Sequence, residues 1–144
     1  MQLDQGRNGP KKRILVVDDE IYIVHILEFS LTMEGYEVVT ASCGEDALRK
    51  AKERQPHLIV LDVMMPGMDG LEVARRLRAD QDTADVPILM LSAKGRPIDR
   101  EAGIENGADD YILKPFSPRR LLDRIRNLFE PDESLGSMDE ASNF

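Results

Sequence analysis

Five short apolar runs alternate along the chain with segments of helical periodicity, and this alternation constrains the fold more than any other feature. Continuous apolar runs of this length are typical of strands buried on both faces. Strands that alternate with helices form a parallel sheet with helices on both sides, because the crossover connections are right-handed. The sequence therefore predicts an α/β fold with a doubly wound, five-stranded parallel sheet. The predicted strands are residues 13–17, 37–40, 58–61, 87–91 and 111–113.

Five helices are predicted between and after these strands, from apolar spacing and from residues that favour helix ends. Gly35 suits the end of the first helix, which we expect from about residue 20 to residue 33. Ser42 and Glu45 have the spacing of a capping box that opens the second helix. The third helix follows the loop 63–70, the fourth covers about 97–106, and the fifth begins near Pro118.

Length and composition indicate one globular domain. The chain has 144 residues, of which 42% are hydrophobic and 32% are charged, and its net charge is −8. This acidity argues against a nucleic-acid-binding surface in this chain. No apolar run reaches the length of a membrane span, so we expect a cytoplasmic protein without a membrane association. We predict a disordered N-terminal segment at 1–11, a domain at 12–130 and an acidic disordered tail at 131–144.

Polar side chains follow several of the predicted strands. Asp18 and Asp19 come directly after the first run, Asp62 follows the third, Ser92 the fourth and Lys114 the fifth. Ligand sites in open parallel sheets lie beyond the carboxyl ends of the strands, so these groups are expected to meet. Clustered carboxylates repel one another unless a cation or a covalent change relieves the charge. This pattern indicates a site of aspartate phosphorylation.

Four segments carry a family resemblance. VVDDE, IVLDVMMPGMDG, LMLSAKG and DDYILKPF resemble the signature segments of the response-regulator receiver domain of two-component signalling, in the same order and spacing over about residues 12–130. The resemblance implies a flavodoxin-like fold with the sheet order 2-1-3-4-5. It also implies a phosphoacceptor switch rather than a conventional enzyme, with Mg²⁺-dependent self-phosphorylation from small phosphodonors and weak hydrolysis of its own phosphoryl group.

The same resemblance implies roles for individual residues. Asp62 would accept the phosphoryl group, and Lys114 would neutralise it, with the Lys114–Pro115 bond in the cis form. Asp18, Asp19, Asp62 and the backbone carbonyl of Met64 would hold Mg²⁺ or Mn²⁺, which prefer oxygen ligands. Taken alone, Asp62 could be a solvated acid at a strand end, and Asp18 and Asp19 could merely cap a helix.

A switch is implied by two further residues. Ser92 resembles the hydroxyl residue that bonds a phosphoryl oxygen, and Tyr111 the aromatic residue that turns inward with it; Ala93 is suitably small for such a pocket. The donor would be a histidine kinase or a histidine phosphotransfer protein. A downstream effector would bind the helix at 97–106, the strand at 111–113 and the helix that begins at 118.

Two alternatives are considered. The segment KPFSPRRLLDRIRNLF resembles the subfamily in which the receiver precedes a winged-helix DNA-binding domain, so the chain could be the receiver part of a longer transcription factor. A phosphatase of the haloacid dehalogenase type also uses aspartate and Mg²⁺, but it needs an Asp-x-Asp pair after its first strand. Asp62-Val63-Met64 is not such a pair. The sequence leaves motor-switch, phosphorelay and transcription contexts open.

Overall fold

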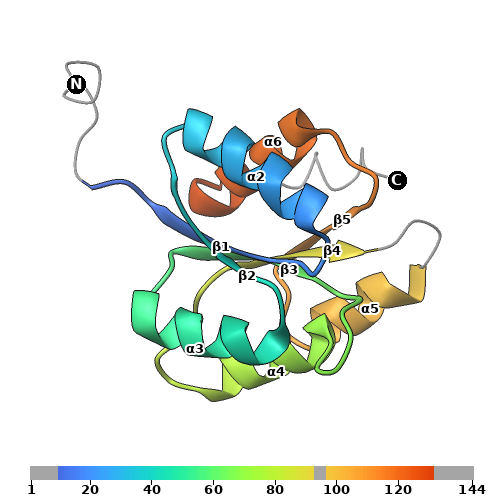
Figure 1. Ribbon diagram of the computed structural model, residues 1–144. Helices are drawn as coiled ribbons and strands as arrows, with labels where there is room; N and C mark the ends of the chain where they lie inside the picture. The colour runs from blue at the N-terminus through green and yellow to red at the C-terminus, as the bar shows by residue number, and fades with distance from the viewer. Residues whose placement is uncertain (1–9, 93–96, 132–144) are drawn as a thin grey trace.

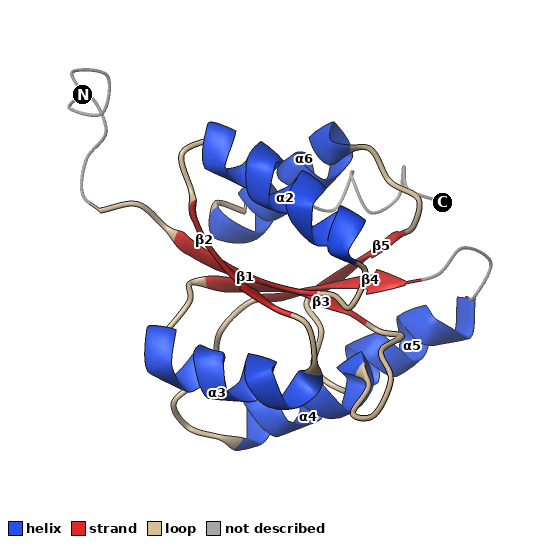
Figure 2. Ribbon diagram, viewed as in Figure 1, coloured by secondary structure: helices blue, strands red, loops and turns tan. Residues whose placement is uncertain are grey.

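The chain forms a parallel sheet between two layers of helices, as predicted (Figures 1 and 2). The computed structural model describes residues 10–92 and 97–131, without the side chains of 97–100. The sheet has five strands in the order β2-β1-β3-β4-β5, and all pairs are parallel. In chain order the elements are β1 (Arg13–Val17), α2 (Ile21–Met33), β2 (Glu37–Ala41), α3 (Gly44–Arg54), β3 (Leu58–Asp62), α4 (Gly70–Ala79), β4 (Ile88–Ser92), α5 (Pro97–Glu105), β5 (Asp110–Leu113) and α6 (Pro118–Phe129).

Alternate residues of the buried strands enter two separate cores, one on each face of the sheet. Helices α2 and α6 cover one face, where Ile14, Val16 and Val60 pack against them. Helices α3, α4 and α5 lie on the other face, where Leu15, Val17 and other side chains of opposite parity are buried. Side chains of successive strand residues point to opposite faces, so a strand buried on both sides must be apolar throughout. This explains why the runs contain no polar alternation.

The predicted element boundaries are correct to within a residue or two, but the capping box is wrong. Helix α3 begins at Gly44, and its N-cap is Cys43, which makes no side-chain cap hydrogen bond. Ser42 precedes the N-cap position by one residue, so it is not the capping residue. The first residue of the helix is tightly packed, because a Cβ atom at Gly44 would lie 2.9 Å from Cβ of Met68. By contrast, Gly35 follows α2 with a φ of 99°, as a C′ glycine should.

The predicted terminal segments and Ala93 lie outside the described residues, apart from Pro10, Lys11 and Pro131. The domain boundaries at 12 and 130 therefore stay predictions. Within the described part of the chain, no helix has the length and apolar character needed to cross a bilayer.

Candidate functional site

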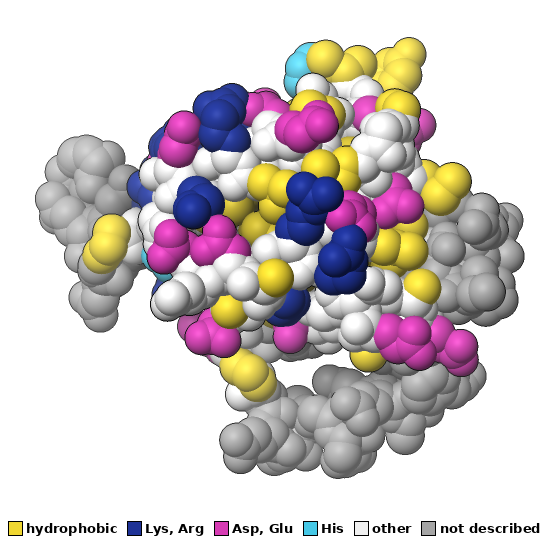
Figure 3. All heavy atoms as spheres, turned by 90° about the horizontal axis from the view of Figure 1, so that it is seen from below, with side chains coloured by type: hydrophobic (Ala, Val, Ile, Leu, Met, Phe, Trp, Pro, Cys, Tyr) yellow, Lys and Arg dark blue, Asp and Glu magenta, His cyan; other side chains and the backbone are white. Residues whose placement is uncertain are grey.

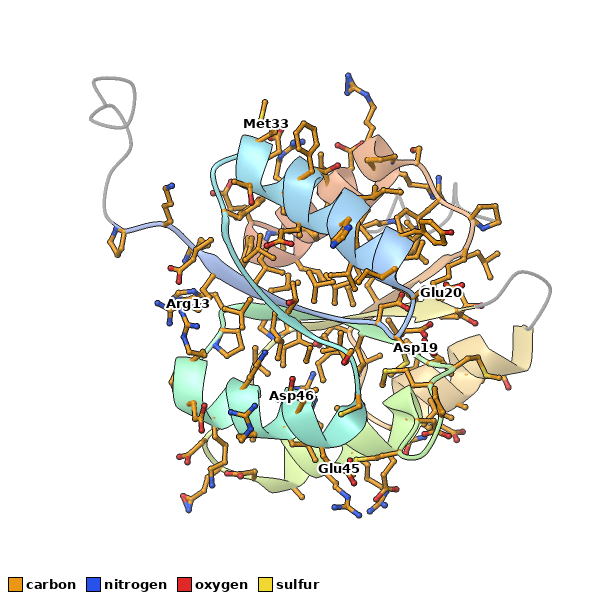
Figure 4. All side chains as sticks on the ribbon, in the orientation of Figure 1. Arg13, Asp19, Glu20, Met33, Glu45 and Asp46 are labelled. Atoms are coloured by element: carbon orange, nitrogen blue, oxygen red, sulfur yellow. The ribbon has the colours of Figure 1, made fainter. Side chains whose placement is uncertain are left out.

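Strand register brings the predicted site residues together at the carboxyl edge of the sheet. Val17 pairs with Leu61 across β1 and β3, so the next residues, Asp18 and Asp62, are neighbours. Ser92 ends β4, and its carbonyl accepts a hydrogen bond from the backbone N–H of Lys114 at 2.7 Å. Figure 4 shows Asp19 at this edge, beside the start of α2 and far from Arg13 at the opposite edge.

Among the described residues, Lys114 is the cation that contacts the acidic cluster. Its Nζ atom lies 2.9 Å from Oδ2 of Asp18 and 3.3 Å from Oδ1 of Asp62. It also donates a hydrogen bond of 2.9 Å to Oε1 of Glu20. One ammonium therefore faces two buried carboxylates and one exposed carboxylate. The peptide bond from Lys114 to Pro115 is cis, as the resemblance implied.

Burial disfavours the charged forms of the Asp18 and Asp62 carboxylates. Burial, with a smaller contribution from the charge of Asp18, raises the pKa of Asp62 to about 7, and Lys114 only partly offsets this. Burial likewise raises the pKa of Asp18. The backbone N–H of Glu20 and the ammonium of Lys114 lower this pKa, but by less than burial raises it. Burial lowers the pKa of Lys114, but its contacts with the carboxylates of Asp18, Glu20 and Asp62 raise this pKa above its ordinary value overall. Lys114 is thus firmly charged, while Asp62 is poorly compensated.

The oxygen atoms of the acidic cluster fit a hard divalent cation. One carboxylate oxygen from each of Asp18, Asp19 and Asp62 lies within 4.8 Å of the other two. Oδ2 of Asp18 is buried and has no aligned hydrogen bond among the described residues, so its approach to Lys114 is an ion pair only. A buried carboxylate oxygen without an aligned hydrogen-bond donor is unusual, and a bound cation would satisfy it. The cluster therefore fits the Mg²⁺ that the family resemblance implied.

Two glycines shape the loop between β3 and α4. A Cβ atom at Gly70 would lie 2.2 Å from the carbonyl oxygen of Asp62, so only glycine allows the loop to close against the end of β3. The N–H of Gly70 donates to the carbonyl of Val63 at 2.8 Å. Gly67 has a φ of 76°, which favours glycine. Both glycines lie in the predicted loop 63–70, but the sequence did not reveal that Gly70 packs on Asp62.

The remaining predicted residues lie around this cluster. Met64 has a 50% exposed side chain and lines a surface depression together with Asp19, Asp62 and Lys114. Ser92 is fully buried at the end of β4. Tyr111 is half-buried on β5 and pairs in register with Met90, two residues before Ser92. The structure thus brings Asp18 and Asp62 into contact with Lys114 and puts Asp19 beside them. Ser92 and Tyr111 lie on the adjoining strands β4 and β5.

Comparison with known proteins agrees with this geometry. The family model described as "Response regulator receiver domain" matches residues 14–126. The chain belongs to this family. It is a receiver domain of two-component signalling, with the flavodoxin-like order of strands that the resemblance implied.

The similar proteins include both longer regulators and single receivers. The chain is 49% identical over 132 residues to the alkaline phosphatase synthesis transcriptional regulatory protein PhoP of Bacillus subtilis, covering 92% of this chain and 54% of that protein. It is 55% identical over 124 residues to the probable transcriptional regulator ycf27 of Cyanophora paradoxa, covering 86% and 51%. The chain thus spans about half the length of these curated relatives.

Solved structures with this fold match at similar levels. A putative response regulator from Chloroflexus aurantiacus has a TM-score of 0.79 at 40% identity, covering 82% of this chain and 97% of that one. The chemotaxis protein CheY4 of Vibrio cholerae has a TM-score of 0.78 at 36% identity, covering 82% and 98%.

One surface feature of the receiver domain was not predicted. Helix α2 exposes a row of large apolar side chains at helical spacing, and the row starts next to Asp19 and Glu20 and extends to Met33 at the far end of the helix (Figure 4). The exposed fractions of the side chains are 76% for Tyr22, 47% for Ile26, 68% for Phe29 and 71% for Met33. Residues three or four apart share one helix face, so this is a continuous apolar strip. Contiguous apolar surface of this kind often indicates an interaction site, whereas single exposed apolar side chains do not.

The opposite face of the receiver domain is charged but mixed in sign. Figure 3 shows this face, formed by α3, α4 and α5, with basic and acidic side chains interspersed. Many of them are paired along the helices, as Arg49 is with Asp46 and Glu53, and Arg76 with Glu72. This surface lacks the concentrated positive charge that nucleic-acid phosphates require.

Proposed function

We propose that this receiver domain accepts a phosphoryl group on Asp62 from a histidine kinase or a histidine phosphotransfer protein. The contact of Lys114 with Asp18 and Asp62 is the observation that carries the proposal. It supplies a fixed positive charge beside a carboxylate at the carboxyl edge of the sheet. Asp62 is the buried member of the cluster that ends the central strand β3, and together with Met64 it lines a depression on the surface.

Phosphoryl transfer to Asp62 mainly requires that the donor be positioned and that the charge of the phosphoryl group be neutralised. Phosphoryl transfer passes through a loose transition state, so a weakly nucleophilic carboxylate suffices if it is held in line with the donor. Lys114 would neutralise the new phosphoryl group with a charge-assisted hydrogen bond. A bound Mg²⁺ or Mn²⁺ would neutralise further phosphoryl charge, held by Asp18, Asp19, Asp62 and the Met64 carbonyl. The product is an acyl phosphate on Asp62, which water slowly removes, so the protein acts as a switch and not as a turnover enzyme.

Signal output would begin at Ser92. Its hydroxyl, at the end of β4, would bond a phosphoryl oxygen, and Tyr111 on β5 would turn inward in response. The surface of α5, β5 and α6 would then change for a downstream effector. Two exposed apolar side chains on this surface support an effector site: Ile104 on α5 is 49% exposed and Leu113 on β5 is 43% exposed.

The apolar strip of α2 would receive the protein that carries the phosphohistidine. A donor histidine that reaches Asp62 must bring the protein surface around it onto the rim of the site, where the strip begins. We expect Tyr22→Ser to slow transfer from a phosphorylated histidine kinase about tenfold, without slowing phosphorylation by acetyl phosphate, which needs no docking. Met33→Ser, eleven residues along the same helix, is the matched control and should have a smaller effect. Equal slowing by both donors would contradict a docking role.

The receiver domain would act in a cytoplasmic signalling pathway, either alone or as part of a longer regulator. The longer relatives are described as transcriptional regulators. The chain's match to about half of each supports the alternative that this receiver is one part of such a regulator. The net charge of −8 and the mixed surface argue against nucleic-acid binding by this chain itself.

Phosphorylation in solution tests the proposed function. Incubation with acetyl phosphate and Mg²⁺ should add one phosphoryl group per chain, and a chelator should reduce the rate at least tenfold because the charge of the phosphoryl group would be less neutralised. Intact-mass spectrometry measures the product. Asp85→Asn, which changes an exposed acid before β4, should be labelled like the wild type. Labelling that is equally fast in chelator would rule out the metal-assisted mechanism.

A further inference from the structure

Glu20 is the carboxylate that contacts Lys114 from outside the acidic cluster. Its Oε1 atom lies 2.9 Å from Nζ of Lys114, the same distance as Oδ2 of Asp18. The two partners differ in surroundings: the side chain of Asp18 is fully buried, whereas that of Glu20 is 57% exposed. Lys114 is therefore held between an inner and an outer carboxylate.

Within the described residues, no other contact of the Glu20 side chain explains its position. Glu20 is the N-cap residue of α2, but its side chain makes no capping hydrogen bond. Its backbone N–H donates instead to Oδ1 of Asp18 at 2.9 Å. That bond fixes the backbone of Glu20 against the cluster and leaves its carboxylate directed at Lys114.

Lys114 and a divalent cation would be held by the same two carboxylates. Asp18 and Asp62 belong to the cluster that fits a metal ion, and both contact Nζ of Lys114. Two cations beside the same carboxylates repel each other strongly in a buried site. Entry of the metal ion therefore requires that Lys114 loosen its contact with Asp18. It must still stay close to Asp62, because the proposed function needs its charge there.

We propose that Glu20 is a positioning residue that holds Lys114 on the solvent side of the cluster and thereby makes room for the divalent cation. The inference rests on the proposed function of the site. Without Glu20, Lys114 keeps only the two inner carboxylates as partners and competes more strongly with the metal ion for them. Glu20 therefore strengthens metal binding although it is not itself a ligand.

Titration calorimetry with Mn²⁺ on the full chain, without a phosphodonor, tests this role. Glu20→Ala should weaken Mn²⁺ binding about fivefold, as expected for the loss of a partly exposed ion pair. In a Lys114→Met background, the same Glu20→Ala change should alter the affinity less than twofold, because the competing ammonium is gone. Glu28→Ala, on the same helix, controls for the loss of one exposed negative charge.

Each contrary outcome has a distinct meaning. Equal weakening by Glu20→Ala in both backgrounds would show that Glu20 acts as a ligand or as a general charge, and it would overturn the inference. Equal weakening by Glu20→Ala and Glu28→Ala would do the same. If the wild type binds Mn²⁺ and is phosphorylated while Glu20→Ala binds as tightly, the inference fails and the proposed function stands. If the wild type binds no Mn²⁺, both fail.

Discussion

Asp62→Asn should make the metal-free protein more stable, by about 2 kcal/mol at pH 8. The pKa of Asp62 rises from its ordinary 3.8 to about 7, chiefly because the carboxylate is buried. Each tenfold change in proton affinity is worth about 1.4 kcal/mol, so the charged carboxylate costs the folded state at most about 4 kcal/mol. Asparagine has nearly the same shape as aspartate but carries no charge, so the cost of burying the charge is removed. The attraction between Lys114 and the Asp62 carboxylate is lost as well, which reduces the expected gain in stability to about half of that cost.

The stability gained by Asp62→Asn should increase as the pH rises. Between pH 4 and pH 7 the folded protein binds more protons at Asp62 than the unfolded chain does, so stability falls as the pH rises through this window. The advantage of Asp62→Asn should therefore be smallest near pH 4 and largest above pH 7. Urea unfolding in chelator measures it, with Asp85→Asn as a control that should show no such trend. An Asp62→Asn protein no more stable than the wild type at pH 8 would contradict the burial argument.

Lys114→Met should have the opposite effect, with a loss of about 3 kcal/mol in chelator at pH 8. Removal of one partner from a buried ion pair leaves an uncompensated charge, which is strongly destabilising. Here two carboxylates, Asp18 and Asp62, are left without their cation. The loss should shrink at low pH, where the carboxylates are protonated, and with added Mg²⁺, which replaces the missing charge.

Lys52→Met provides the matched control for Lys114→Met. Lys52 also contacts two carboxylates, those of Asp80 and Asp82, but all three side chains lie at the surface, and Lys52 is 56% exposed. Exposed ion pairs contribute roughly 0–1 kcal/mol, so this variant should unfold close to the wild type. If both lysine variants lose the same stability, the site cannot have the electrostatic strain described here.

The fold was predictable because its strands are buried on both faces. Runs such as Leu58–Leu61 have no polar alternation, and all four of these residues are fully buried. The cluster of Asp18 and Asp62 followed from the same logic, since parallel strands end at one edge and their register makes the two residues neighbours. Family resemblance then supplied roles that spacing alone did not, including that of Met64.

Features that depend on packing were not predictable. Gly44, the first residue of α3, lies close to Met68, and no local sequence pattern indicates this contact. The Glu20–Lys114 bond joins residues 94 positions apart, and nothing in either neighbourhood indicates the other. The apolar strip of α2 had a usable signal. A helix that covers a sheet needs one apolar face, and the segment IYIVHILEFSLTM is apolar on nearly every side.

The identity of the phosphorylated residue is tested most directly by chemical mapping. After reaction with acetyl phosphate and Mg²⁺, borohydride reduces an aspartyl phosphate to homoserine, which peptide mass spectrometry locates. We predict homoserine at position 62 in the wild type and none at that position in Asp62→Asn. Homoserine at Asp18 or Asp19 instead, or labelling of Asp62→Asn at the wild-type rate, would contradict the assignment of Asp62 as the acceptor.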